Sequence, residues 1–292
     1  MTLYLTDTTK SYENQTSKST FVSGECQVVF GVKLYPAGAT TNSQDGVTDL
    51  FKKCLPVLQE MIEHNMPLLV HGEVTNLEVD MFDREKVFIE TVLSLSVQKF
   101  SRLKVVMEHV TTMDAVKFVE SCTYVGFVAA TVTPQHLVLN RNFLFQGGLQ
   151  PHNYCLPVFN RDIHTVTSGS KRFFLGTDSA PYDRRRKECS YGCAGIYNAP
   201  VALSVYAKMF EKFSSYKSMT YIWLFAFSEN ALDKLEAFTS FNGSDFCGLS
   251  RNNSKIKLSK TPWKVSESFS YASGDITPMF AGEMLNWLLA PL

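Results

Sequence analysis

Four polar residues that can act on a metal ion or a proton each follow a short apolar run. Lys33 ends VVFGVK, His71 ends LLVH, His109 ends KVVMEH and Asp178 ends FFLGTD. Imidazole and carboxylate are common zinc ligands, and lysine becomes one only when carbon dioxide converts its amine to a carbamate. The recurrence of such residues at one position of a repeated pattern predicts a metal centre.

Each of these residues also has an ordinary structural interpretation. Lys33 suits a snorkelling surface lysine, the two histidines suit the edge of a core, and Asp178 suits a turn or a helix cap. The repeated position favours a site over four unrelated structural roles. Two alternatives stay open nearby: Glu73 either orients a ligand histidine or is a solvated acid, and His136 and His152 either line the same site or are structural.

The elements that must position these side chains alternate between strands and helices. We expect strands near residues 3–5, 28–33, 68–71, 104–109, 125–131 and 173–178, and helices near 50–65, 82–98, 113–121, 199–213 and 231–241. This order predicts a parallel α/β barrel, in which the carboxyl ends of the strands share one mouth. No linker divides the chain, so we expect one domain over 1–292, with a short-stranded tail from Leu249 onward.

Composition limits the classes of function. With 292 residues, 45% of them hydrophobic, the chain can bury a sizeable core, and 28 basic residues balance 28 acidic ones. A neutral balance argues against nucleic acid and favours a small neutral or anionic substrate. We interpret the basic cluster 184–187 as a solvated loop face. Seven scattered cysteines favour a reducing compartment, and the sequence predicts a soluble protein without a signal peptide or a membrane span.

The residues above lie within longer motifs: VKLYPAGATTNS, PLLVHGE, EHVTT, TPQHL, NRN and LGTDSAP. These motifs resemble the dihydroorotases, the zinc amidohydrolases of pyrimidine synthesis. The segments RRRKEC, GCAGIYNAPVALSVYA and NNSKIKLSKTPWKV are most similar to plant members. The resemblance implies a TIM barrel with two zinc ions. Lys33 would be the carbamylated bridging lysine, His71 and His109 ligands of the second zinc, and Asp178 a ligand of the first zinc that also shuttles a proton.

The same resemblance implies a substrate site and a setting. Thr40 and Thr41 would belong to a mobile lid, and Asn42, Leu156 and Ala194 would lie in segments that line the substrate. The substrate would be N-carbamoyl-L-aspartate, cyclised reversibly to (S)-dihydroorotate. A homodimer is implied, and so is a mitochondrial or plastid location for a plant-type member, or a cytoplasmic one otherwise.

Several features depart from the family pattern. Family members carry a His-x-His pair that holds the first zinc, and this chain has none. We therefore expect the barrel to lack its first two βα units and the first zinc site to be impaired. Tyr182 stands where the family has a histidine that holds the substrate carboxylate, and a phenol supplies no imidazolium charge.

Two segments further along the chain also depart from the family. The helix near 164–166 is short, and the segment 213–228 interrupts a helical region, as an altered transcript would. The departures leave two alternatives to the dihydroorotase. One is a non-catalytic fragment or pseudoenzyme, and the other is a different metallohydrolase that uses His136 or His152.

Overall fold

A computed structural model describes residues 2–10, 30–123, 126–159, 168–212, 231–271 and 274–291. The chain divides into two compact units, Met1–Thr131 and Val132–Leu292, and each is described by itself. The expectation of one domain over 1–292 stays a prediction. The predicted strand start at 28–29, the short helix at 164–166 and the interrupting segment 213–228 lie outside the described residues.

The first unit contains a parallel sheet. Its strands pair in chain order: β1 (Thr2–Leu5), β2 (Gly31–Leu34), β3 (Leu68–His71), β4 (Val105–Glu108) and β5 (Val128–Val132). Every residue of β2 and β5 is buried. Continuous apolar runs are typical of strands covered on both faces. The predicted parallel α/β arrangement is therefore confirmed, with every strand end within three residues of the one expected.

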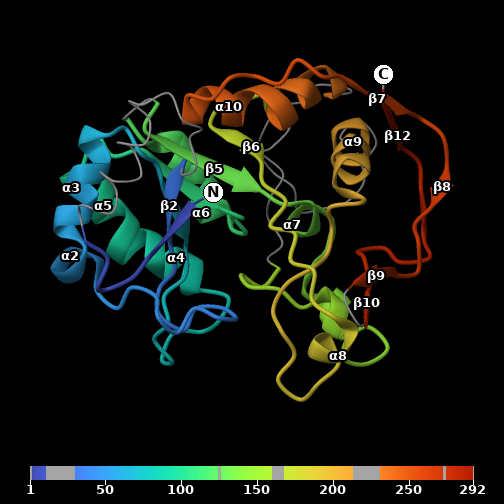
Figure 1. The fold of residues 1–292 in the computed structure, drawn as a ribbon, viewed down its shortest axis with the longest axis horizontal. Helices are drawn as coiled ribbons and strands as arrows, with labels where there is room; N and C mark the ends of the chain where they lie inside the picture. The colour runs from blue at the N-terminus through green and yellow to red at the C-terminus, as the bar shows by residue number, and fades with distance from the viewer. Residues whose placement is uncertain are drawn as a thin grey trace. The chain divides into compact units, whose positions relative to one another are not determined.

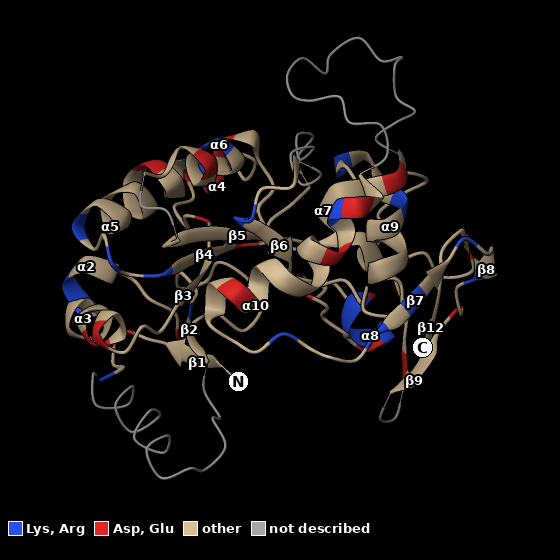
Figure 2. Ribbon diagram, turned by 90° about the horizontal axis from the view of Figure 1, so that it is seen from above, with Lys and Arg blue, Asp and Glu red and all other residues tan. Residues whose placement is uncertain are grey.

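Helices flank the strands of this unit, and Figure 1 shows α2, α3 and α5 to the left of β2. They are α2 (Leu50–Lys53), α3 (Leu55–Glu63), α4 (Arg84–Phe88), the π-helix η1 (Ile89–Leu93), α5 (Ser94–Lys99) and α6 (Met113–Ser121). Helix α6 has its predicted bounds. It begins at Met113 because the Thr112 hydroxyl caps it by accepting a hydrogen bond from Ala115 N. Charged residues colour the helices in Figure 2, whereas β3 and β5 carry none.

The second unit begins at the end of β5. Gly176 N, just after β6 (Phe173–Leu175), donates to Val132 O at 3.4 Å, so the strand order continues from β5 to β6. The helices are α7 (Pro134–Val138), η2 (Arg141–Leu144), η3 (Pro151–Asn153), α8 (Arg184–Lys187), α9 (Ala202–Lys212), η5 (Leu232–Lys234), the π-helix η6 (Ala237–Phe241) and α10 (Asn242–Cys247).

The tail after Leu249 consists of short antiparallel pairs, as predicted. Strand β7 (Ile256–Ser259) pairs with β12 (Leu288–Pro291), β8 (Trp263–Lys264) with β11 (Met284–Leu285), and β9 (Phe269–Tyr271) with β10 (Gly274–Ile276). The six cysteines in the described part of the chain are all free thiols. Among the described residues, no helix combines the length and the apolar character needed to cross a membrane.

A buried tyrosine joins α9 to the end of β5. The Tyr206 hydroxyl donates to Val132 O at 2.6 Å, and its side chain is fully buried. We predict that Tyr206→Phe lowers the free energy of unfolding by about 1–2 kcal/mol, because the carbonyl loses a buried donor. Urea denaturation at neutral pH measures this change. Tyr191→Phe is the matched control, since Tyr191 is 83% exposed, and equal changes in both variants would contradict the assignment.

Candidate active site

Two predicted metal ligands in the first unit face each other. His71 ends β3 and His109 follows β4, and both side chains are buried. His71 Nδ1 lies 3.2 Å from His109 Nε2. Two imidazole nitrogens that share a tetrahedral zinc ion, each about 2.0–2.1 Å from the metal, are about 3.3–3.4 Å apart. The pair therefore fits two ligands of one zinc ion.

A carboxylate fixes the orientation of one ring. Glu73 Oε2 lies 2.7 Å from His71 Nε2, and the Glu73 side chain is buried. A carboxylate at this nitrogen favours the tautomer with the proton on Nε2, which leaves the Nδ1 lone pair for a metal. Of the two alternatives left open for Glu73, the structure has the contact with a candidate ligand histidine and not the solvated acid.

The backbone at two candidate site residues has an uncommon conformation. His109 has φ 44° and Asp178, in the second unit, has φ 45°. Non-glycine residues rarely adopt positive φ, although Asp and His do so more often than most, and such residues cluster at active sites. Around His109, Thr131 supports the turn: its Oγ1 accepts from His109 N at 2.8 Å and its carbonyl accepts from Val110 N at 3.1 Å. The surrounding structure thus maintains the strained geometry of this ligand candidate.

Lys33 lies on β2, near the same strand ends. Its side chain is almost completely buried, and its Nζ forms an ion pair with the Glu108 carboxylate and lies 4.6 Å from the Tyr35 ring centroid. An ammonium has no lone pair with which to bind a metal. Among the described residues, no group of three or more His, Cys, Asp or Glu side chains is arranged to hold an ion. The structure brings together the two histidines, and the role of Lys33 stays a prediction.

A buried glutamate supports the segment after His109. Glu85, on α4, accepts hydrogen bonds from Thr111 N at 2.9 Å and from Thr111 Oγ1 at 3.1 Å. Desolvation raises the pKa of Glu85 to about 7, although the threonine hydrogen bonds oppose this effect. Sequence reasoning did not identify Glu85, because a glutamate in an amphipathic helix ordinarily faces solvent.

The predicted lid residues lie in a compact loop between β2 and α2. Thr40 N donates to Ser43 Oγ at 2.8 Å, and Ser43 Oγ donates back to Thr40 O at 2.7 Å. Asn42 has φ 62° and is exposed. Thr41 is partly exposed beside it. The loop therefore has its own hydrogen bonds, and its action as a lid stays a prediction.

In the second unit, the histidines considered as alternative ligands have structural partners. His136 is buried, with Nδ1 2.5 Å from Thr133 Oγ1 and Nε2 2.9 Å from Pro157 O. Both ring nitrogens are engaged by the protein, which favours the structural interpretation. His152 Nε2 lies 2.8 Å from Glu188 Oε1 in a partly exposed pair.

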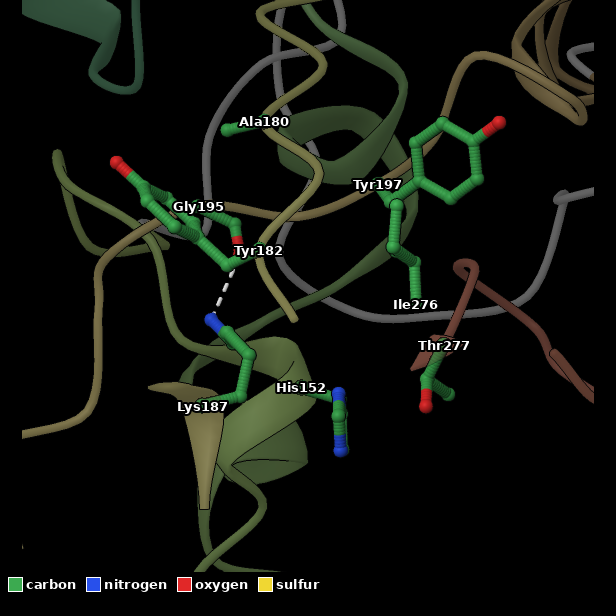
Figure 3. A pocket seen from close by; sticks show the side chains of 8 residues that line it. All are labelled: His152, Ala180, Tyr182, Lys187, Gly195, Tyr197, Ile276 and Thr277. Atoms are coloured by element: carbon green, nitrogen blue, oxygen red, sulfur yellow. Dashed lines mark hydrogen bonds between the residues drawn. The ribbon is translucent and has the colours of Figure 1, made fainter. Parts of the chain in front are cut away.

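Tyr182, Ala194 and Leu156 also belong to the second unit. Tyr182 lines a small pocket together with Lys187, Gly195 and Tyr197 (Figure 3). Burial raises the pKa of the Tyr182 hydroxyl, so the side chain is a neutral phenol at physiological pH. Ala194, next to Gly195, is buried, and Leu156 is partly exposed.

The interpretation of the basic cluster 184–187 as a solvated face is wrong for Lys187. Its side chain is 3% exposed, and its Nζ donates to three main-chain carbonyls. Arg185, by contrast, is mostly exposed and pairs with Asp183. Neighbouring arginines in the sequence gave no signal that the last residue of the cluster points inward.

Glu85 generates a prediction about stability and pH. Its pKa is higher in the folded state than the 4.5 of an exposed glutamate. Between about pH 4.5 and pH 7 the folded state therefore binds one proton more at Glu85 than the unfolded state does. The free energy of unfolding declines as pH rises through this range. We predict that Glu85→Gln removes most of this decline, which is roughly 3 kcal/mol in the wild type. Denaturant unfolding measured from pH 4.5 to 7.5 checks it, with the exposed Glu90→Gln as the control that should retain the decline.

Known proteins are similar in sequence to nearly the whole chain. The amidohydrolase family model matches residues 9–283. A protein named mitochondrial dihydroorotase from Arabidopsis thaliana is 64% identical over 293 residues, which cover 98% of this chain and 72% of the relative. This chain is thus shorter than that plant relative.

Solved structures are similar over nearly the whole chain. The dihydroorotase of Saccharomyces cerevisiae in complex with 5-fluoroorotic acid has a TM-score of 0.83 at 27% identity, and covers 100% of this chain and 80% of its own. The dihydroorotase of Campylobacter jejuni has a TM-score of 0.79 at 31% identity, covering 99% of this chain and 77% of its own. The predicted α/β fold of TIM-barrel type is confirmed.

Proposed function

Since this chain belongs to the amidohydrolase family and, within it, to the dihydroorotases, we propose that it interconverts N-carbamoyl-L-aspartate and (S)-dihydroorotate in pyrimidine biosynthesis. The reaction closes or opens a cyclic amide. The observation that carries the proposal is the pair of buried imidazole nitrogens, 3.2 Å apart, at the carboxyl ends of two adjacent parallel strands. In barrels of this type the active site is built at these strand ends.

His71 and His109 would hold one zinc ion through Nδ1 and Nε2, respectively. Zinc bound there supplies a Lewis acid for the amide carbonyl and lowers the pKa of a water molecule. Glu73 would maintain the His71 tautomer that this binding needs. Lys33 would join as a carbamate, as the family resemblance implies.

Asp178 would move the proton. During ring opening its carboxylate accepts a proton from the attacking water and returns it to the leaving amide nitrogen. Thr40 and Thr41 would close over the substrate, and Leu156, Ala194 and Tyr182 would line it. By similarity to the plant relative, whose name includes mitochondrial, we also propose a mitochondrial location, and the family resemblance supports a homodimer.

The decisive experiment is an assay of the purified chain with dihydroorotate, combined with metal analysis. We expect turnover in both directions and zinc bound in proportion to protein. A folded chain that binds zinc but shows no turnover would support the alternative, a non-catalytic member of the family. That alternative is favoured by Tyr182, which stands where the family has a histidine.

Removing one ligand tests the metal assignment. We predict that His71→Ala lowers the zinc content and reduces turnover by about 100-fold or more, because a ligand of the metal is lost. His64→Ala is the matched control, since His64 pairs with Glu60 on the surface of α3. Unchanged zinc content in a folded His71→Ala protein would refute the assignment.

The proton-transfer role of Asp178 has a different signature. We predict that Asp178→Asn lowers kcat by about 100- to 10,000-fold, as expected for loss of a general acid and base. Steady-state kinetics across pH measures the effect, and the wild-type pH profile should flatten in the variant. A change confined to KM would assign Asp178 to binding instead.

A further inference from the structure

Lys187 uses its whole hydrogen-bonding capacity inside the second unit. It ends α8, and its Nζ donates to Tyr154 O at 2.9 Å, Cys193 O at 2.8 Å and Gly195 O at 2.6 Å. An ammonium has three N–H donors, so each donor has one carbonyl. Figure 3 shows the side chain pointing at Gly195. Lys187 therefore joins the segment at Tyr154, 33 residues before it in the sequence, to the segment that contains Cys193 and Gly195.

Burying the Lys187 ammonium costs free energy unless polar groups of the protein replace its water. Within the part of the chain that the structure describes, no carboxylate forms an ion pair with Lys187, and burial lowers its pKa to about 8. A buried charge is tolerated when polar groups replace its water. Here three carbonyl dipoles do so, and a neutral amine, with only two donors, could not bind all three. The charge is thus used to hold these carbonyls.

The two joined segments carry the residues proposed to line the substrate. Leu156 follows Tyr154 by two positions, and Ala194 lies between Cys193 and Gly195, whose carbonyls both accept from Lys187. Gly195 N also donates to Tyr154 O at 2.9 Å, so the segments contact each other directly.

Gly195 brings Tyr182 into the same arrangement. It has φ 150°, and a Cβ at this position would lie 2.8 Å from Tyr182 Cε2 and 2.5 Å from Ala180 Cβ. The Gly195 backbone therefore packs against the Tyr182 ring with no intervening side chain. Fixing the Gly195 carbonyl also fixes the surface on which that ring rests.

We propose that Lys187 is a positioning residue, which holds the backbone of the segments 154–156 and 193–195 in the arrangement that presents Leu156, Ala194 and Tyr182 to the substrate. This proposal rests on the dihydroorotase function proposed above. Lys187 does not contact the substrate in this scheme. It acts through the carbonyls on either side of Ala194 and through the carbonyl of Tyr154.

The test compares Lys187→Met with Lys171→Met, an exposed lysine of the same unit. Methionine is similar in length and has no donor. We expect Lys187→Met to raise KM for dihydroorotate by about tenfold or more, with a smaller change in kcat, because substrate-lining backbone is displaced. Amide hydrogen exchange should become faster in peptides covering 154–156 and 193–195 and stay unchanged in α9. Lys171→Met should change neither quantity.

Two results would overturn the proposal. One is an unchanged KM in folded Lys187→Met, and the other is faster exchange throughout α9 as well, which would indicate general destabilisation. Should Lys187→Met fail to fold, Lys187→Arg retains charge and donors, and we then expect a smaller rise in KM with local exchange changes at the same two segments. The exchange measurement needs no substrate, so an inactive wild type would refute the proposed function without deciding the linkage between the segments.

Discussion

The parallel pairing of β3 with β4 is the constraint on which the candidate metal site depends. The register aligns Leu68 with Val105 and His71 with Glu108, so that His109 comes one residue after the partner of His71. Side chains alternate between the faces of a strand, and a shift of one residue would exchange those faces. The apolar residues of both strands are buried and oppose such a shift. The hydrophobic pattern therefore determines the separation of the two imidazole rings.

Near the ends of β3 and β4 the protein contains several features that lower its stability. Buried polar side chains, a backbone in the left-handed region at His109 and an ionisable carboxyl at Glu85 all reduce stability when taken singly. Each is compensated locally: Thr131 supports His109, and Thr111 donates to Glu85. Strain and buried charge are tolerated near the site because neighbouring backbone groups are arranged to satisfy them.

The sequence alone predicts the features that depend on local pattern. The strand ends at His71 and His109 are evident because apolar runs precede them, and α6 has the bounds that the sequence predicts. The expected helix over 82–98 is present but contains the π-helix η1, which a periodicity of 3.6 residues does not reveal.

Residues whose role depends on distant partners could not be predicted. Lys187 has arginines as sequence neighbours, yet its environment comes from carbonyls contributed by Tyr154, Cys193 and Gly195. Gly195 in turn packs directly against Tyr182. Its positive φ favours glycine, and a Cβ at this position would collide with the Tyr182 ring and with Ala180 Cβ. A side chain at position 195 is therefore excluded twice, by the backbone conformation and by the aromatic ring at position 182.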